Sequence, residues 1–139
     1  RLLACTPAQQ MKLLPLAHLA ADTYGGQVVQ QVLEGATDAG VLGLALQLVQ
    51  GQASLERARA LLEHPDWEVR SQAALALGRI GQPIDRARLI ALLSDREWWV
   101  RFRAAQALVT MPGIELRTLR ALHAGLEDRY ARDMLTQVM

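Results

Sequence analysis

The residues of this chain whose side chains could act as bases or nucleophiles are few and widely separated. Its histidines are His18, His64 and His123, and none belongs to an H-E-x-x-H ligand pair of the kind that holds a catalytic zinc. His123 and Glu127 stand four residues apart, which would place a base beside an acid on one helix face. Because no nucleophile or third group accompanies them, we interpret the pair as solvated and expect no enzymatic activity.

Metal, phosphate and covalent chemistry also lack their sequence signatures. Cys5 is the single cysteine, so the sequence predicts neither an intramolecular disulfide nor a Cys/His metal site. Gly25-Gly26 lacks the G-x-x-x-x-G-K pattern of a phosphate-binding loop, and we interpret it as the entry to a helix. We therefore expect no cofactor and no bound metal.

Aromatic and basic side chains offer a different chemistry, that of recognition. Trp98 and Trp99 are consecutive, so on a helix they point about 100° apart and cannot both enter one core seam. Phe102 and Arg103 follow one turn later. Tryptophan and arginine are enriched in binding hot spots, which makes Trp99, Phe102 and Arg103 the candidate partner-binding residues. The alternative is that Trp99 packs against Tyr130 of the next unit.

An internal repeat determines where these side chains lie. Residues 61–77 (LLEHPDWEVRSQAALAL) and 92–108 (LLSDREWWVRFRAAQAL) share 9 of 17 residues without a gap, at an offset of 31. Within each copy the apolar residues recur three or four apart, as on one face of a helix. A Gly or Pro break follows each copy. We expect each unit to form two packed helices, with Trp67 and Trp98 filling the gap between neighbouring units.

The repeat divides the chain into clear and degenerate units. The clear repeats are 53–82 and 84–113, and a truncated repeat occupies 115–139. Residues 7–51 form degenerate N-terminal helices in which the repeated arginine is missing. We expect 1–139 to be a single domain of about four helical hairpins.

Helix starts and one interruption can be located within these units. Thr6 with Gln9, and Ser94 with Glu97, have the spacing of capping boxes at helix N-termini. Pro15 lies inside the first expected helix, where it should kink or break the helix by removing a backbone donor.

The pattern LL-x4-W-x-VR-x2-AA-x-AL, followed by the Gly or Pro break, resembles HEAT repeats of the short bacterial kind, also called HEAT-like or bilin-lyase-type repeats. The resemblance covers residues 53–139 well and 7–51 poorly. It implies an all-α, right-handed α-solenoid whose second helices line the concave side. It also implies a structural ladder between units, formed by Asp66, Glu97 and Asp128 with Arg70, Arg101 and Arg132.

Charge and composition then separate the classes of function. Fifteen Lys and Arg against fourteen Asp and Glu give a net charge of +1, which disfavours nucleic acid as a partner. We expect a non-catalytic scaffold or adaptor that binds another protein through its concave, second-helix face. Two alternatives stay open: nucleic-acid binding, because a family of DNA-repair glycosylases uses similar helices, and a tetrapyrrole lyase or chaperone, because of the repeat's family name.

Location is only weakly indicated by the sequence. Apolar runs such as 13–17 and 39–46 are much shorter than the roughly 20 residues that cross a bilayer. The single thiol fits a reducing, cytoplasmic compartment. A start at Arg1 is typical of a fragment, and flanking segments of a longer chain could anchor it to a membrane.

Overall fold

The computed structural model describes residues 5–20 and 22–139, with side chains for 5–16 and 26–139. In these residues every regular element is helical. The elements are α1 (Pro7–Ala20), α2 (Asp22–Gly35), α3 (Ala39–Leu48), η2 (Gln52–Ser54), α4 (Leu55–Leu61), α5 (Trp67–Ile80), η3 (Pro83–Asp85), α6 (Arg86–Leu92), α7 (Trp98–Thr110), α8 (Leu116–Gly125) and α9 (Arg129–Val138), where η marks a short 3₁₀ helix.

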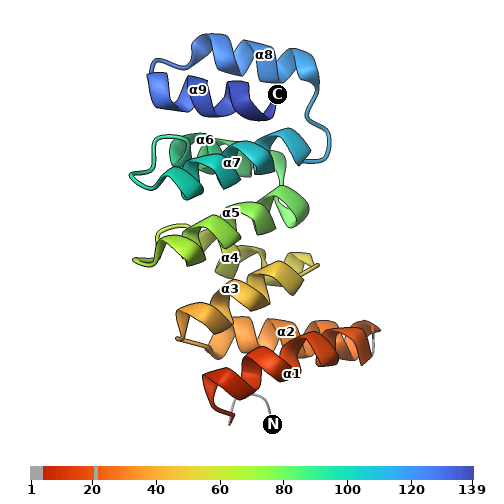
Figure 1. Ribbon diagram of the computed structural model, residues 1–139. Helices are drawn as coiled ribbons and strands as arrows, with labels where there is room; N and C mark the ends of the chain where they lie inside the picture. Colours follow the sequence, from red (N-terminus) through yellow and green to blue (C-terminus); the bar gives the residue numbers. More distant parts are fainter. Residues whose placement is uncertain (1–4, 21) are drawn as a thin grey trace.

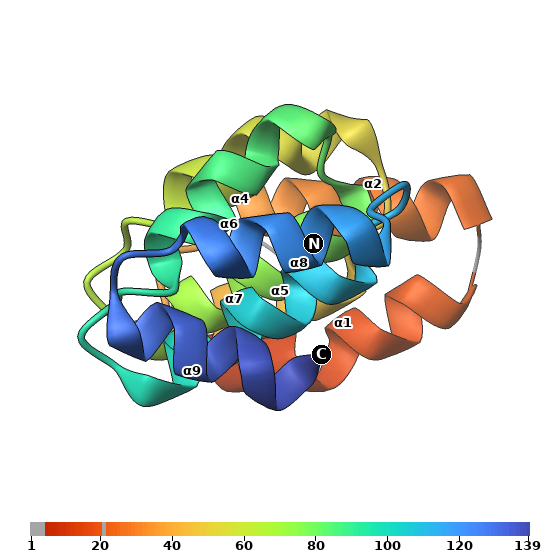
Figure 2. The same ribbon diagram turned by 90° about the horizontal axis from the view of Figure 1, so that it is seen from above.

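The helices stack in two rows along one axis (Figure 1). Seen from above, α2, α4, α6 and α8 lie on one side, while α1, α5, α7 and α9 lie on the other (Figure 2). The second helices of the pairs, α3, α5, α7 and α9, each pack against the next, and α1 packs against α3 at the end of this row. The described part of the chain is therefore an α-solenoid of four helical hairpins preceded by α1, which confirms the predicted fold class.

Small side chains bring α5 and α7 together in the most extensive helix pairing of the solenoid. Each of the two helices carries three fully buried alanines: Ala73, Ala74 and Ala76 on α5, and Ala104, Ala105 and Ala107 on α7. Gly78 lies so close to α7 that a Cβ atom there would stand 2.9 Å from the Cα of Ala107. The two helices are thus in backbone contact, which a larger residue at position 78 would prevent.

The N-terminal helices confirm one expectation from the sequence and differ from two others. The capping box at Thr6 is present, because Thr6 N–H donates to Gln9 Oε1 (2.9 Å) and Gln9 N–H donates to Thr6 Oγ1 (3.3 Å). Pro15 does not break the helix: α1 is continuous from Pro7 to Ala20, and the fully buried Leu14 anchors it to the core. Gly25-Gly26 lies inside α2 and not before a helix.

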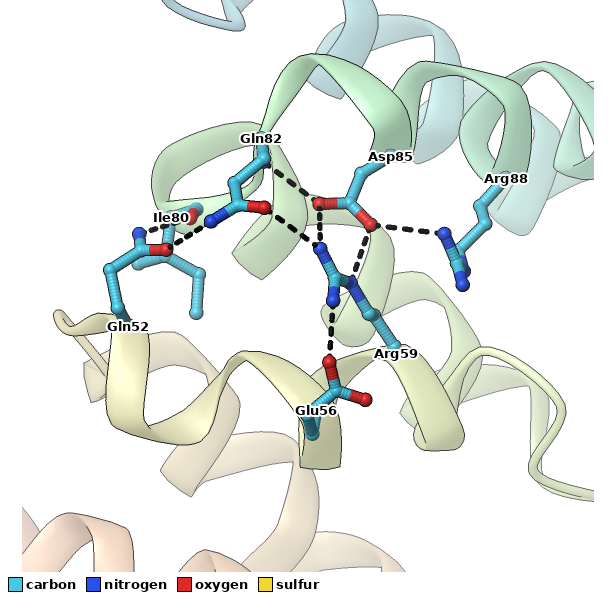
Figure 3. A network of polar contacts seen from close by, with 7 residues as sticks. All are labelled: Gln52, Glu56, Arg59, Ile80, Gln82, Asp85 and Arg88. Atoms are coloured by element: carbon cyan, nitrogen blue, oxygen red, sulfur yellow. Dashed lines mark hydrogen bonds and ion pairs between the residues drawn. The ribbon is translucent and has the colours of Figure 1, made fainter.

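A buried ion pair joins two neighbouring units on the side of the first helices (Figure 3). The repeat pattern did not predict this ion pair. Arg59 of α4 donates from Nε to Oδ1 of Asp85 (2.7 Å) and from Nη2 to Oδ2 (3.0 Å). Asp85 also accepts from the backbone N–H of Gln82 (2.8 Å) and from Arg88 Nη1 (3.4 Å). Because the Asp85 carboxylate is fully buried, these donors take the place of the water it has lost.

The environment of Asp85 has opposing effects on its pKa. Burial alone would raise the pKa, because it disfavours the charged form. Hydrogen bonds from Arg59 and Gln82, together with the charges of Arg59 and Arg88, outweigh burial and hold the pKa of Asp85 below its ordinary value. The carboxylate therefore contributes stability above the pKa of an unfolded aspartate, and this contribution is lost as the pH falls through the folded-state pKa.

Asp85→Asn is expected to lower the free energy of unfolding by about 1–3 kcal/mol at pH 7, because Arg59 loses its buried carboxylate partner and keeps only the exposed Glu56. The difference from the parent should shrink as the pH falls below about 4, where the unfolded aspartate takes up a proton, and should vanish below the lower folded-state pKa. Urea denaturation followed by circular dichroism at several pH values measures both effects. Asp133→Asn is the matched control, since Asp133 belongs to an exposed pair with Arg129 and its loss should change little. Equal effects of the two substitutions would contradict the assignment.

Gly78→Ala is expected to destabilise the protein by about 1–2 kcal/mol, although alanine is the better helix former, because its Cβ would collide with Ala107. Gly43→Ala should have the opposite sign and stabilise by about 0.5–1 kcal/mol, because its Cβ would meet only Gln72 Cγ at 3.8 Å. Thermal and urea unfolding of both variants check the pair. A stabilised Gly78→Ala variant would show that the close approach of α5 and α7 is not a constraint.

Candidate functional site

Three arginines fix the loops from which the second helices start. Arg70 donates from Nη1 to the carbonyls of His64 (2.9 Å) and Pro65 (3.0 Å). Arg101 and Arg132 repeat this contact one and two units later, each bonding the carbonyls six and five residues before it. The repeated arginine therefore clamps the loop of its own unit, and this clamp positions the first turns of α5, α7 and α9.

The acid that pairs with Arg70 is not the one that the ladder hypothesis proposed. Arg70 binds Asp95 of the next unit with two hydrogen bonds of 3.1 Å, from Nε and from Nη2. Asp66 instead accepts from Glu68 N–H (2.8 Å) and caps α5, as Asp128 caps α9 by accepting from Tyr130 N–H (2.9 Å). An aspartate at the N-cap is thus used by its own helix.

At α7 the capping roles are distributed differently. Glu97 is the N-cap residue of α7 but makes no side-chain cap bond, and its N–H donates to Asp95 Oδ1 (2.9 Å). Ser94 does not form the expected capping box with Glu97, because its hydroxyl donates across the unit boundary to the Asp128 carboxylate. Asp95 and Asp128 therefore link neighbouring loops, and the predicted Glu97 does not.

Arg101 lacks the carboxylate that Arg70 has, because Leu126 stands where the 31-residue offset would place the counterpart of Asp95. Its guanidinium lies over the ring of Tyr130, 5.6 Å from the centroid. The pKa of Asp128 is lowered mainly by the hydrogen bond from Ser94 and to a smaller extent by the charge of Arg101. The ladder is therefore complete between the two clear repeats and weaker toward α9.

Arg70→Ala is expected to lower the free energy of unfolding by about 1–3 kcal/mol, because it releases two loops and leaves Asp95 without its partner. Arg132→Ala removes only the contact with its own loop, and its effect should be smaller. Chemical denaturation of both variants makes the comparison. If Arg132→Ala costs as much as Arg70→Ala, the bond to Asp95 adds nothing measurable.

The aromatic residues at the start of α7 form one cluster. The Trp98 and Phe102 rings stack with centroids 5.1 Å apart, and Trp99 meets Trp98 edge-on at 4.8 Å. The Arg103 guanidinium lies 5.5 Å from the Trp99 ring and 5.8 Å from that of Phe102. Trp99 keeps 48% of its surface exposed. Its ring neighbours are thus on its own helix, whereas Tyr130, the proposed alternative neighbour, lies under Arg101.

Contrary to the expectation from the sequence, Trp67 and Trp98 do not fill the gap between units. They are 37% and 41% exposed, respectively. Both occupy the first residue of a second helix, at the rim of the stack, while alanine and leucine side chains fill the interior between the units. The exposed aromatic surface of the solenoid is therefore larger than expected.

Trp99 and Arg103 line a groove of about 400 Å³ that crosses the second-helix row. Residues of four helices form it, and we call it the concave groove: Met11 of α1; Ala39, Gly40, Gly43, Leu44 and Gln47 of α3; Trp67, Glu68, Ser71 and Gln72 of α5; and Trp99 and Arg103 of α7. The groove is open over α3 because Gly40 and Gly43 present no side chain. Met11 and the α3 residues of the groove were not predicted from the sequence. The signal that could have indicated them is a pair of glycines three residues apart on a charge-free helix.

Phe102 lies outside the concave groove. It lines a second hollow of about 480 Å³ between α5, α7 and α9, together with Leu75, Val109 and Val138. The predicted trio is thus brought together as one cluster that separates two hollows, with Trp99 and Arg103 facing one and Phe102 facing the other.

The residues considered for catalysis have structural contacts. His123 Nε2 bonds Thr136 Oγ1 (2.9 Å), and His64 Nδ1 accepts from Asp66 N–H (3.0 Å). His18 lies outside the described side chains. No group of three potential metal ligands from His, Cys, Asp or Glu occurs within the described residues. Of the helices in the described ranges, none has the length and apolar character needed to span a bilayer.

Stacked helical hairpins, each with an arginine that clamps its own loop, define a helical-repeat protein of the α-solenoid class. Comparison with family models matches HEAT repeats over residues 37–109 and 61–139, and these matches together span more than half of the chain. The chain therefore belongs to the HEAT-repeat family. A search of curated proteins finds no match. HEAT repeats commonly mediate protein–protein interactions, and the family is generally non-catalytic.

Proposed function

We propose that this protein is a non-catalytic scaffold that binds another protein through the face formed by its second helices. The observation that carries the proposal is the half-exposed Trp99 with the Arg103 guanidinium stacked on it at the edge of the concave groove. Rigid aromatic side chains and arginine supply much of the binding energy of protein interfaces. A large apolar ring kept in contact with water is thus a candidate anchor for a partner.

Repeat stacking does not require these side chains. The equivalent positions of the preceding unit hold Glu68, Ser71 and Gln72 in place of Trp99, Phe102 and Arg103. The residues that α7 does need for stacking are Val100, Ala104 and Leu108, which are fully buried. The half-exposed Trp99 therefore stands where the preceding unit has Glu68, while Phe102 and Arg103 are half-buried beside it.

Protein is favoured over nucleic acid as the partner. Of the solenoid's basic side chains, Arg59 pairs with a buried carboxylate, while Arg70, Arg79 and Arg101 donate to backbone carbonyls. Burial lowers the pKa of Arg79, whose guanidinium bonds the carbonyls of Leu46, Gln47 and Val49 at the end of α3. These arginines are engaged inside the fold, and the net charge of the chain is only +1, so the basic excess that phosphate binding usually requires is missing.

Site-specific photocrosslinking tests the proposal in the cell that makes the protein. A photoreactive phenylalanine analogue at position 99 is expected to capture another protein, identified by mass spectrometry, while the same analogue at Arg120 of α8 is not. Arg120 is an exposed residue on the first-helix row. Crosslinks at position 120 alone, or to nucleic acid at position 99, would overturn the proposal.

The Trp99→Glu, Arg103→Glu double variant is expected to lose the captured partner while its melting temperature changes by no more than about 2 °C, because Trp99 is half-exposed and the side-chain hydrogen bond of Arg103 goes to Gln106 of the same helix. Calorimetry of unfolding and a binding titration with the purified partner provide the two measurements. A loss of several degrees would instead assign Trp99 and Arg103 to the packing between units.

A further inference from the structure

The concave groove holds two charged side chains that no other charged group in the described chain neutralises. Arg103 donates from Nη1 to Gln106 Oε1 (2.9 Å), and no ion pair joins it to a carboxylate of the described residues. Glu68 is exposed at the start of α5 and has no cationic partner within the same residues. Both line the groove, yet they do not pair with each other. The groove therefore offers a separate cation and anion to an occupant.

The third part of the groove is uncharged and, apart from Gln47, apolar. Helix α3 contains no charged residue, and it contributes Gly43 and Leu44 to the lining. Met11 of α1 completes this part and is 44% exposed. Along the stack, the groove thus presents a base on α7, an acid on α5 and an apolar surface on α3 and α1.

The spacing of these parts matches an extended peptide. Packed helices lie about 8–10 Å apart, and α7, α5 and α3 are successive members of one row (Figure 1). Three residues of polyproline II or extended chain span about 9–10 Å. Every third side chain of such a peptide would therefore meet the next helix of the row.

We propose that the concave groove binds an extended segment of a partner protein that carries an acidic, a basic and an aliphatic side chain at three-residue intervals. The acidic side chain pairs with Arg103, the basic one with Glu68 beside the Trp67 ring, and the aliphatic one packs on Leu44 and Met11. This inference rests on the proposed function and names the chemistry of the partner.

Fluorescein-labelled nonapeptides and the full chain test the inference by fluorescence anisotropy. The probe carries glutamate, arginine and leucine at its second, fifth and eighth positions, with alanine and proline elsewhere, and its reversed sequence covers the other chain direction. One of the two is expected to bind, and a peptide with glutamine in place of both charged residues should bind about tenfold more weakly.

A charge exchange identifies the contact itself. Arg103→Glu should weaken binding of the probe about tenfold, and a peptide with arginine in place of glutamate should recover most of that loss. Arg120→Glu makes the same change of net charge on α8 and should leave binding unchanged. Circular dichroism confirms that each variant is folded.

The outcomes separate this inference from the proposed function. Equal binding of the charged and glutamine peptides, or failure of the charge exchange, overturns the inference. If no peptide binds while position 99 still crosslinks to a protein, the inference fails and the proposed function stands. If neither binding nor crosslinking occurs, both fail.

Discussion

Contact between the backbones of α5 and α7 is the constraint on which the rest of the solenoid depends. Gly78 of α5 has no side chain, and buried alanines line both helices, so α5 and α7 approach until Gly78 lies against Ala107. That approach also sets the distance between neighbouring loops, so that Arg70 can reach Asp95 with two bonds. On the first-helix row, Arg59 and Asp85 bridge the same pair of units. The two clear repeats, 53–82 and 84–113, are thus held together by two ion pairs and one close helix contact.

The same constraint divides the residues of α7 into two groups. Val100, Ala104 and Leu108 are fully buried and have little freedom to vary, because any change of volume would alter the stack. Trp99 and Arg103 line the concave groove and do not fill the core between units. Packing between units and the proposed recognition therefore use different faces of one helix. This separation lets the exposed positions carry an unusual composition without disturbing the fold.

The repeat allowed the helices, their pairing and the importance of the arginines to be predicted, because each depends on residues that recur at one offset. Features that occur once could not be predicted in this way. Asp95 is replaced by His64 and Leu126 in the neighbouring units, and Asp85 has Ser54 and Leu116 as its counterparts. Met11 and Gly43 come from the degenerate part, so their approach to Trp99 depends on tertiary packing. Trp67 and Trp98 were misplaced because a recurring aromatic residue suggests a core position, whereas these two lie at the rim.

The arginine clamps also make the two edges of the solenoid unequal in their tolerance of insertions and deletions. At the edge where second helices begin, Arg70 and Arg101 each bond carbonyls five and six residues earlier, so an added residue in those loops would break the register of these bonds. At the opposite edge, the turn after α7 contains Gly113 with a φ of 78° and open space around it. Length variation among related chains should accordingly accumulate at the latter turn, and a fused tag or domain would be accommodated there with least disturbance.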